Sequence, residues 1–152
     1  MEVTDIITPE RTFTDVEGTS KKRVLENAAG LIAQQAPEFT ANELFDNLIT
    51  RERLGSTAIG KGVAIPHCRA KHCSHTIGAL FKLQEPVDFD AQDDEPVDLM
   101  FVLLVPEEAT EEHLQLLSQI AQRFSDENVR DSLREARDKN AFFEEFVKNP
   151  SH

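Results

Sequence analysis

The sequence predicts a layered α/β domain, and three observations support this prediction. Segments with a helical period alternate with segments that resemble strands. The chain has 152 residues, a length that buries roughly 70% of the unfolded chain's surface and forms a core without disulfides or metals. Hydrophobic residues make up 39% of the chain and charged residues 29%, as in globular proteins. We therefore expect one domain over residues 1–152.

Two helices are predicted in the first third of the chain. Ser20 is a suitable N-cap for a helix that continues to about Ala36, with apolar residues spaced along one face. Thr40 and Glu43 form a capping-box pattern that opens a second helix, and Gly55 is a typical stop for it.

The middle of the chain changes to a strand-like pattern. A short strand is predicted at 63–65 and longer strands at 77–83 and 97–105, the last of them apolar enough for burial on both faces. The acidic, proline-bounded connection EPVDFDAQDDEP is expected to be a solvated loop with at most a short edge strand. Three more helices should follow, with Thr110, Asp126 and Asp138 as caps.

The net charge of −12 excludes two classes of function. Non-specific nucleic-acid binding and docking on an anionic membrane both require a positive surface. The chain begins without a signal-peptide pattern, and its longest apolar run, 99–105, is too short to cross a bilayer. We expect a cytoplasmic protein with no membrane insertion and no nucleic-acid partner.

The charge is unevenly distributed along the chain. Residues 51–82 carry a charge of +5, whereas residues 83–112 carry −11. The basic segment also contains His67, His72 and His75. This segment is therefore the first place to look for chemistry.

Three interpretations of the histidine-bearing segment remain open on the residues alone. His67 could be an ordinary loop histidine that packs or hydrogen-bonds locally. The set His67, Cys68, His72, Cys73 and His75 could bind zinc, but its adjacent His-Cys pairs lack the spacing of zinc motifs. His67 could also accept a phosphoryl group, because a neutral imidazole is nucleophilic and lysines and arginines surround it in sequence.

A resemblance favours the third interpretation. The segment GSTAIGKGVAIPH at 55–67 resembles the active-site motif of the mannitol/fructose-class enzyme IIA proteins of the bacterial phosphoenolpyruvate-dependent phosphotransferase system. The similarity continues through FDAQDDEPVDLMFVLLVP at 89–106 and EEHLQLLSQIA at 111–121, and covers about residues 5–148. The amino-acid sequences of these blocks most resemble those of the nitrogen-regulatory branch of the family. The resemblance implies a three-layer α/β/α domain with a mixed sheet and helices on both faces.

The resemblance also implies roles for three residues. His67 matches the histidine that becomes phosphorylated, His113 matches a second histidine beside it, and Arg51 matches a basic residue near the phosphoryl group. A histidine at the start of a helix would also lie in a positive field that favours a neutral imidazole and welcomes an anion. No cofactor and no metal are implied. Surface positions are expected for His72, Cys73 and His75, and Cys68 replaces the small residue usual after the active histidine.

The implied function is phosphoryl transfer and regulation rather than independent turnover. The donor would be a histidine phosphocarrier protein, and the phosphorylation state would control targets such as sensor kinases or potassium-transport components. A sugar-transport enzyme IIA that passes the phosphoryl group to a IIB domain is the first alternative. A zinc-binding module is the second.

Overall fold

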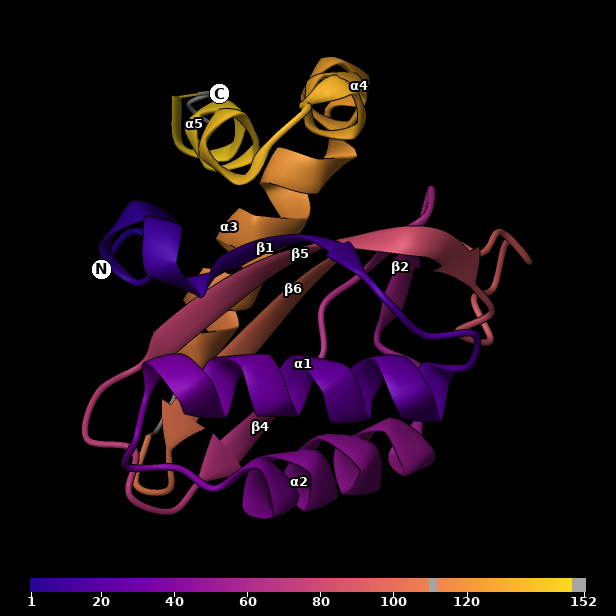
Figure 1. Ribbon diagram of the computed structural model, residues 1–152. Helices are drawn as coiled ribbons and strands as arrows, with labels where there is room; N and C mark the ends of the chain where they lie inside the picture. Colours follow the sequence, from indigo (N-terminus) through magenta and orange to yellow (C-terminus); the bar gives the residue numbers. More distant parts are fainter. Residues whose placement is uncertain (110–111, 149–152) are drawn as a thin grey trace.

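The computed structural model describes residues 1–109 and 112–148, which form three layers (Figure 1). Helices α1 and α2 cover one face of a sheet, and α3, α4 and α5 lie on the other. The helices are α1 Lys21–Gln35, α2 Ala41–Leu54, α3 Glu112–Ser125, α4 Glu127–Glu135 and α5 Lys139–Lys148. The strands are β1 Thr12–Val16, β2 Ala58–Gly60, β3 Val63–Ala64, β4 His67–Ala70, β5 Ile77–Val87 and β6 Val97–Pro106. Two short 3₁₀ turns, Val3–Asp5 and Pro9–Arg11, precede β1.

The sheet is mixed, as the resemblance implied. Among the described residues it has six strands in the order β1-β5-β6-β3-β2, with β4 also paired to β6. Strand β5 runs antiparallel to β6, whereas β3 and β4 run parallel to it. Strand β6 is therefore the centre of the sheet, and β4, which begins at His67, is held directly against it.

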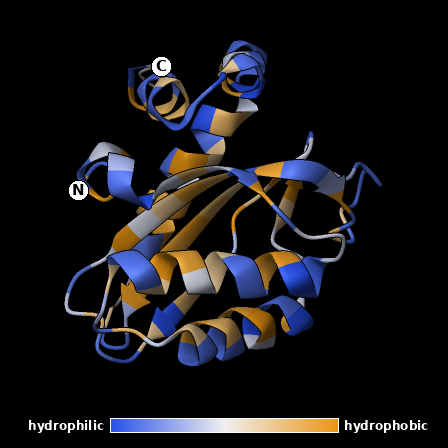
Figure 2. Cartoon of the chain, in the orientation of Figure 1, coloured by the Kyte–Doolittle hydropathy of each residue, from blue (hydrophilic) through white to orange (hydrophobic). Residues whose placement is uncertain are grey.

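Alternate side chains of β6 enter two different cores. Met100, Val102 and Leu104 pack with α1 and α2. Leu99, Phe101, Leu103 and Val105 pack with the C-terminal helices on the opposite face. This period of two explains the continuous apolar run predicted as a doubly buried strand, and Figure 2 shows the hydrophobic colouring of this strand beneath helices of mixed polarity.

The predicted helix caps are confirmed wherever the structure describes them. Ser20 Oγ accepts from Arg23 N at 3.2 Å, and Thr40 Oγ1 accepts from Glu43 N at 3.2 Å. Asp126 and Asp138 accept in the same way from the first turns of α4 and α5. Thr110, the expected cap of α3, lies outside the described residues.

The acidic connection differs from the predicted solvated loop. Strand β5 continues to Val87, and both Val87 and Ala91 are buried. Phe89, with 0% exposure, lies in the core beneath α1 and α2. The carboxylates on either side of it face water, so the segment is solvated on one side and anchored on the other.

Three strands were not predicted, and the shortest of them is β2. Strand β1 is short, polar in part and at the edge of the sheet, and β4 reads His-Cys-Arg-Ala. Neither has the apolar alternation on which strand prediction depends. Both form because an adjacent, strongly apolar strand supplies the hydrogen-bonding partner.

No helix in the described part of the chain combines the length and apolar character needed to span a bilayer.

Candidate functional site

His67 is the first residue of β4 and follows a tightly held Ile-Pro segment. Its register partner on β6 is Leu103, and Leu103 N donates to Pro66 O at 2.9 Å. The imidazole is half-buried. The backbone that carries it is thus part of the sheet, whereas the predicted strand in this segment ended at residue 65.

One hydrogen bond determines which nitrogen of His67 is free. Nδ1 lies 2.9 Å from the carbonyl oxygen of Ile65. A carbonyl oxygen only accepts, so Nδ1 must carry the proton of the neutral ring. The lone pair is therefore on Nε2, which is the nucleophilic atom.

The surroundings of His67 favour its neutral form. Burial of the ring is the largest influence and lowers its pKa below the usual 6.5. Electrostatic repulsion from Arg51 and from His113 lowers the pKa of His67 further, while the Ile65 hydrogen bond and the Glu52 carboxylate oppose it. At neutral pH the imidazole is consequently uncharged and available as a nucleophile.

The three predicted site residues line one hollow, which we call the His67 hollow. It has a volume of about 480 Å³ and is bordered by Arg51 from α2, His67 from β4 and His113 from α3. An adjacent hollow of about 350 Å³ shares Arg51 and His67 and adds Thr57. Residues far apart in sequence thus meet around one imidazole.

Arg51 and His113 are positioned differently. Arg51 Nη1 donates to Gly55 O at 2.9 Å, which holds the guanidinium at the C-terminal end of α2. His113 lies in the first described turn of α3, as predicted. Its Nδ1 is buried and makes no hydrogen bond to the described residues.

Arg69 also borders the His67 hollow, and it was not among the predicted site residues. Its Nη1 donates to Glu107 O at 3.0 Å and to Ala109 O. These carbonyls precede α3 in the chain. Arg69 therefore links the strand that bears His67 to the segment that leads to His113.

The basic segment does not converge on this site as a whole. Lys82 Nζ donates to the carbonyls of Leu133, Arg134 and Ala136 at 3.1, 3.1 and 2.6 Å, at the C-terminal end of α4. Lys61 N donates to Asp93, and Lys61 O accepts from Arg134. Only some of the basic residues of the +5 segment therefore lie near His67, because Lys61 and Lys82 contact other parts of the fold.

The cysteine and histidine cluster separates in the structure. Cys68 borders the His67 hollow, and burial raises the pKa of its thiol to about 12. His72 and His75 are exposed, as expected. The expected surface position of Cys73 was wrong, because it is 7% exposed and packs in the core beside α1 and α2. Within residues 1–109 and 112–148, no three His, Cys, Asp or Glu side chains are arranged to hold a metal ion.

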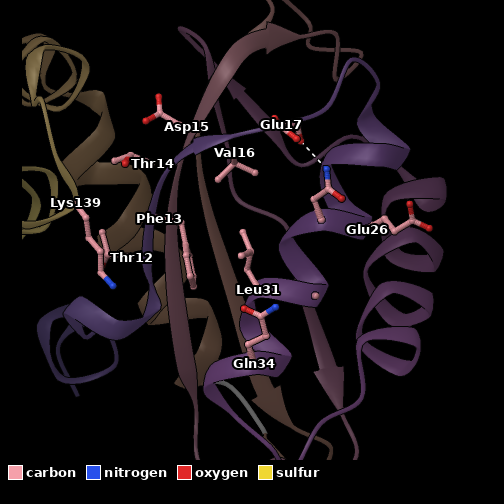
Figure 3. Close-up of a pocket in the computed structure, with 12 residues that line it drawn as sticks. Thr12, Phe13, Thr14, Asp15, Val16, Glu17, Glu26, Leu31, Gln34 and Lys139 are labelled. Carbon is pink, nitrogen blue, oxygen red and sulfur yellow. Dashed lines mark hydrogen bonds between the residues drawn. The ribbon is translucent and has the colours of Figure 1, made fainter.

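A larger hollow, of about 600 Å³, lies elsewhere, between β1, α1 and Lys139 of α5 (Figure 3). Its rim carries the carboxylates of Asp15, Glu17 and Glu26. It contains no histidine or cysteine. The smaller His67 hollow, in contrast, is lined by two imidazoles and a thiol.

The chain is similar to known proteins over most of its length. Residues 5–149 match the family described as phosphoenolpyruvate-dependent sugar phosphotransferase system, EIIA 2. A nitrogen regulatory protein of Pseudomonas aeruginosa is 55% identical over 139 residues, which cover 91% of this chain and 90% of that protein. A nitrogen regulatory protein of Escherichia coli is 39% identical, over 90% of this chain and 83% of its own.

Solved structures show the same fold. The crystal structure of nitrogen regulatory protein IIA-Ntr from Neisseria meningitidis superposes with a TM-score of 0.86 at 40% identity, covering 94% of this chain and 97% of that one. The IIA mannitol structure from Escherichia coli, at 18% identity, has a TM-score of 0.76 over 93% of this chain and 99% of its own, and shares the fold. The chain therefore belongs to the EIIA 2 family of the phosphoenolpyruvate-dependent sugar phosphotransferase system.

Proposed function

We propose that this protein is a regulatory phosphoryl carrier that accepts a phosphoryl group on Nε2 of His67 from a histidine phosphocarrier protein. The observation that carries the proposal is the Nδ1 hydrogen bond to Ile65 O, which leaves the Nε2 lone pair free beside the His67 hollow. A neutral, oriented imidazole next to cationic groups meets the chemical needs of phosphoryl acceptance.

The transfer step balances without an additional reactant. The N–P bond of the donor phosphohistidine breaks while a bond forms between phosphorus and His67 Nε2. The donor imidazole leaves with the electron pair of the broken bond. Because Ile65 O holds the Nδ1 proton throughout, the product ring is a phosphorylated imidazolium whose positive charge lies next to the phosphoryl oxygens.

Arg51 and His113 would stabilise the negative charge that is spread over the transferring phosphoryl oxygens. A guanidinium offers several N–H donors in one plane, which suits these oxygens. His113 lies beside the hollow with a buried ring nitrogen that has no partner among the described residues. It would orient the phosphoryl group without carrying it.

The surroundings of the hollow suit a protein donor. Leu54 borders the His67 hollow and is 83% exposed, and Ile59 borders the adjacent hollow and is 47% exposed. Leu114, next to His113, is 56% exposed. Large apolar side chains that remain in water around a nucleophile favour contact with an apolar face of the phosphocarrier.

Regulation follows from the charge that phosphorylation adds. A phosphoryl group brings a charge of about −1.5 to −2 to a site bordered by two arginines, which changes the surface that a target protein meets. The relatives named nitrogen regulatory protein support a regulatory role for this chain. We place the exchange in the cytoplasm, with sensor kinases or potassium-transport components as the target classes.

Mass spectrometry tests the proposal directly. The protein would be incubated with phosphoenolpyruvate, the first enzyme of the phosphotransferase system and the phosphocarrier, and kept at neutral or alkaline pH. Wild type and His72→Ala, an exposed control in the same segment, should each gain one phosphoryl group, and His67→Ala should gain none. His113→Ala should accept the group about tenfold more slowly, the effect expected for loss of one hydrogen bond to a charged group. A His67→Ala protein that still gains one group would refute the proposal.

A second candidate, sugar transport, has one observation in its favour. The fructose-specific EIIA component of Haloferax volcanii is 35% identical, over 91% of this chain and 92% of its own. That function uses the same chemistry at His67 but passes the group to a IIB domain. Rapid transfer from the phosphorylated protein to a purified fructose or mannitol IIB protein would support it over the regulatory role.

A further inference from the structure

Glu52 is a buried carboxylate that the phosphoryl chemistry described above does not use. It lies in the last turn of α2 next to Arg51, and it is 4% exposed. A carboxylate that leaves water loses its hydration, so it is stable only with close partners. Those partners connect it to His67.

The Glu52 carboxylate holds one residue, Thr57, by two bonds. Oε1 accepts from Thr57 Oγ1 at 2.6 Å, and Oε2 accepts from Thr57 N at 2.9 Å. Oε2 also accepts from Lys21 Nζ at 3.2 Å, which supplies a compensating positive charge. Two bonds from one carboxylate fix both the position and the orientation of Thr57.

Thr57 in turn positions the backbone that contacts His67. Ile65 N donates to Thr57 O at 3.0 Å. Ile65 O then accepts from His67 Nδ1 at 2.9 Å. A continuous hydrogen-bonded path, which we call the Glu52 relay, therefore runs from Glu52 through Thr57 and Ile65 to the imidazole.

We propose that Glu52 is a positioning residue that holds the Ile65 carbonyl in place and thereby keeps the proton of His67 on Nδ1. The proposal rests on the proposed function, in which Nε2 is the nucleophile. If the Ile65 carbonyl moves, the proton is free to occupy Nε2 and block that atom. Glu52 thus controls the fraction of molecules that are ready to accept the phosphoryl group.

This role differs from a purely structural one. A structural carboxylate would affect only the free energy of unfolding. The Glu52 relay ends on one ring nitrogen, so its loss must also change the tautomer of His67 in protein that is still folded. Nitrogen-15 chemical shifts of the ring distinguish the two neutral tautomers and measure this directly.

The principal variant is Glu52→Gln. Glutamine keeps the shape of the side chain but has one acceptor oxygen, so it leaves a donor of Thr57 or Lys21 facing an amide NH₂ group. At pH 8 we expect wild-type His67 to show the Nδ1–H tautomer alone and Glu52→Gln to show a measurable Nε2–H population. The rate of phosphoryl acceptance should fall about tenfold, a loss typical for a hydrogen bond to a charged group.

Three further variants control for folding and for charge. Thr57→Val removes the hydroxyl donor without changing the side-chain shape and should lower the rate about threefold. Thr57→Ser restores the hydroxyl and should return both tautomer and rate to wild type. Asp90→Asn removes the charge of an exposed carboxylate whose Oδ2 lies 3.0 Å from Lys21 Nζ. This variant should change neither the tautomer of His67 nor the rate of phosphoryl acceptance.

The outcomes separate this proposal from the proposed function. Wild-type tautomer and rate in folded Glu52→Gln would overturn it, as would an unchanged tautomer in Thr57→Val if Glu52→Gln fails to fold. The tautomer is measured on unphosphorylated protein. If the phosphoryl group proves to be on another residue, the proposed function fails while the tautomer measurement still decides whether Glu52 positions His67.

Discussion

Replacing Phe89 by alanine tests whether the acidic connection between β5 and β6 is anchored in the core. The Phe89 ring has 0% exposure and packs beneath α1 and α2. Lys21 Nζ lies 5.5 Å from the ring centroid, and Ser56 Oγ donates to Phe89 O at 2.5 Å. The residue therefore joins the acidic segment to the turn that follows α2.

The expected loss is large. Truncating a fully buried phenylalanine typically costs about 3–5 kcal/mol, because the contacts of the ring are lost and a cavity remains. For a domain of this size, that loss lowers Tm by roughly 6–20 °C. Folded domains are stable by only about 5–15 kcal/mol. Phe89→Ala should therefore still be folded at 25 °C, but with a much smaller free energy of unfolding.

Urea unfolding at pH 7, monitored by far-ultraviolet circular dichroism, measures this loss. Phe143→Ala is a matched control, because Phe143 on α5 is only partly buried and should cost less than about 2 kcal/mol. Phe89→Leu retains most of the apolar volume and should recover about half of the loss. A Phe89→Ala protein no less stable than Phe143→Ala would refute the anchoring of this segment.

Four other perturbations have expected outcomes. Because the pKa of His67 is lowered below 6.5 by burial and by Arg51 and His113, phosphoryl acceptance should stay constant as pH falls to 6.5 and decline only below it. Arg51→Gln should move the midpoint of that decline upward, toward 6.5. Lys82→Met should destabilise the protein by about 2 kcal/mol in urea, because it leaves the three carbonyls at the end of α4 without their charged donor. The thiol of Cys68 has a pKa of about 12, so iodoacetamide should modify it at pH 8 far more slowly than a free cysteine.

The expected outcomes for pH, Lys82→Met and Cys68 alkylation each have a result that would contradict them. A midpoint at or above pH 6.5 in wild type would mean that burial does not control the His67 imidazole. Unfolding of Lys82→Met at the wild-type urea concentration would mean that water replaces the ammonium group without loss. Rapid alkylation of Cys68 would show that its thiol is exposed in solution.

The same lowered pKa links stability to pH. Since the folded-state pKa of His67 is below the unfolded value, its contribution to stability is present above pH 6.5 and is lost as pH falls through the folded value. Glu52 on α2 opposes this shift, whereas Arg51 and His113 strengthen it. Acid should therefore weaken both the fold and the acceptor.

The sequence by itself determined the elements with strong local signals. The α/β class, the caps at Ser20, Thr40, Asp126 and Asp138, and the buried strand β6 were all predicted, because capping residues and apolar period act within a few residues of the chain. The motif around His67 and the block containing His113 were also identifiable, since their residues are contiguous.

Only the tertiary structure decided how these parts work together. The Nδ1 proton of His67, the burial of Glu52, the approach of Arg69 to the segment before α3 and the anchoring of Phe89 all depend on contacts between separate segments. In the sequence, Glu52 is only a single acidic residue within a basic segment. In the folded protein, Thr57 and Lys21 surround its carboxylate. Burial and hydrogen-bond partners arise from the packing of distant residues, and no local pattern in the sequence specifies them.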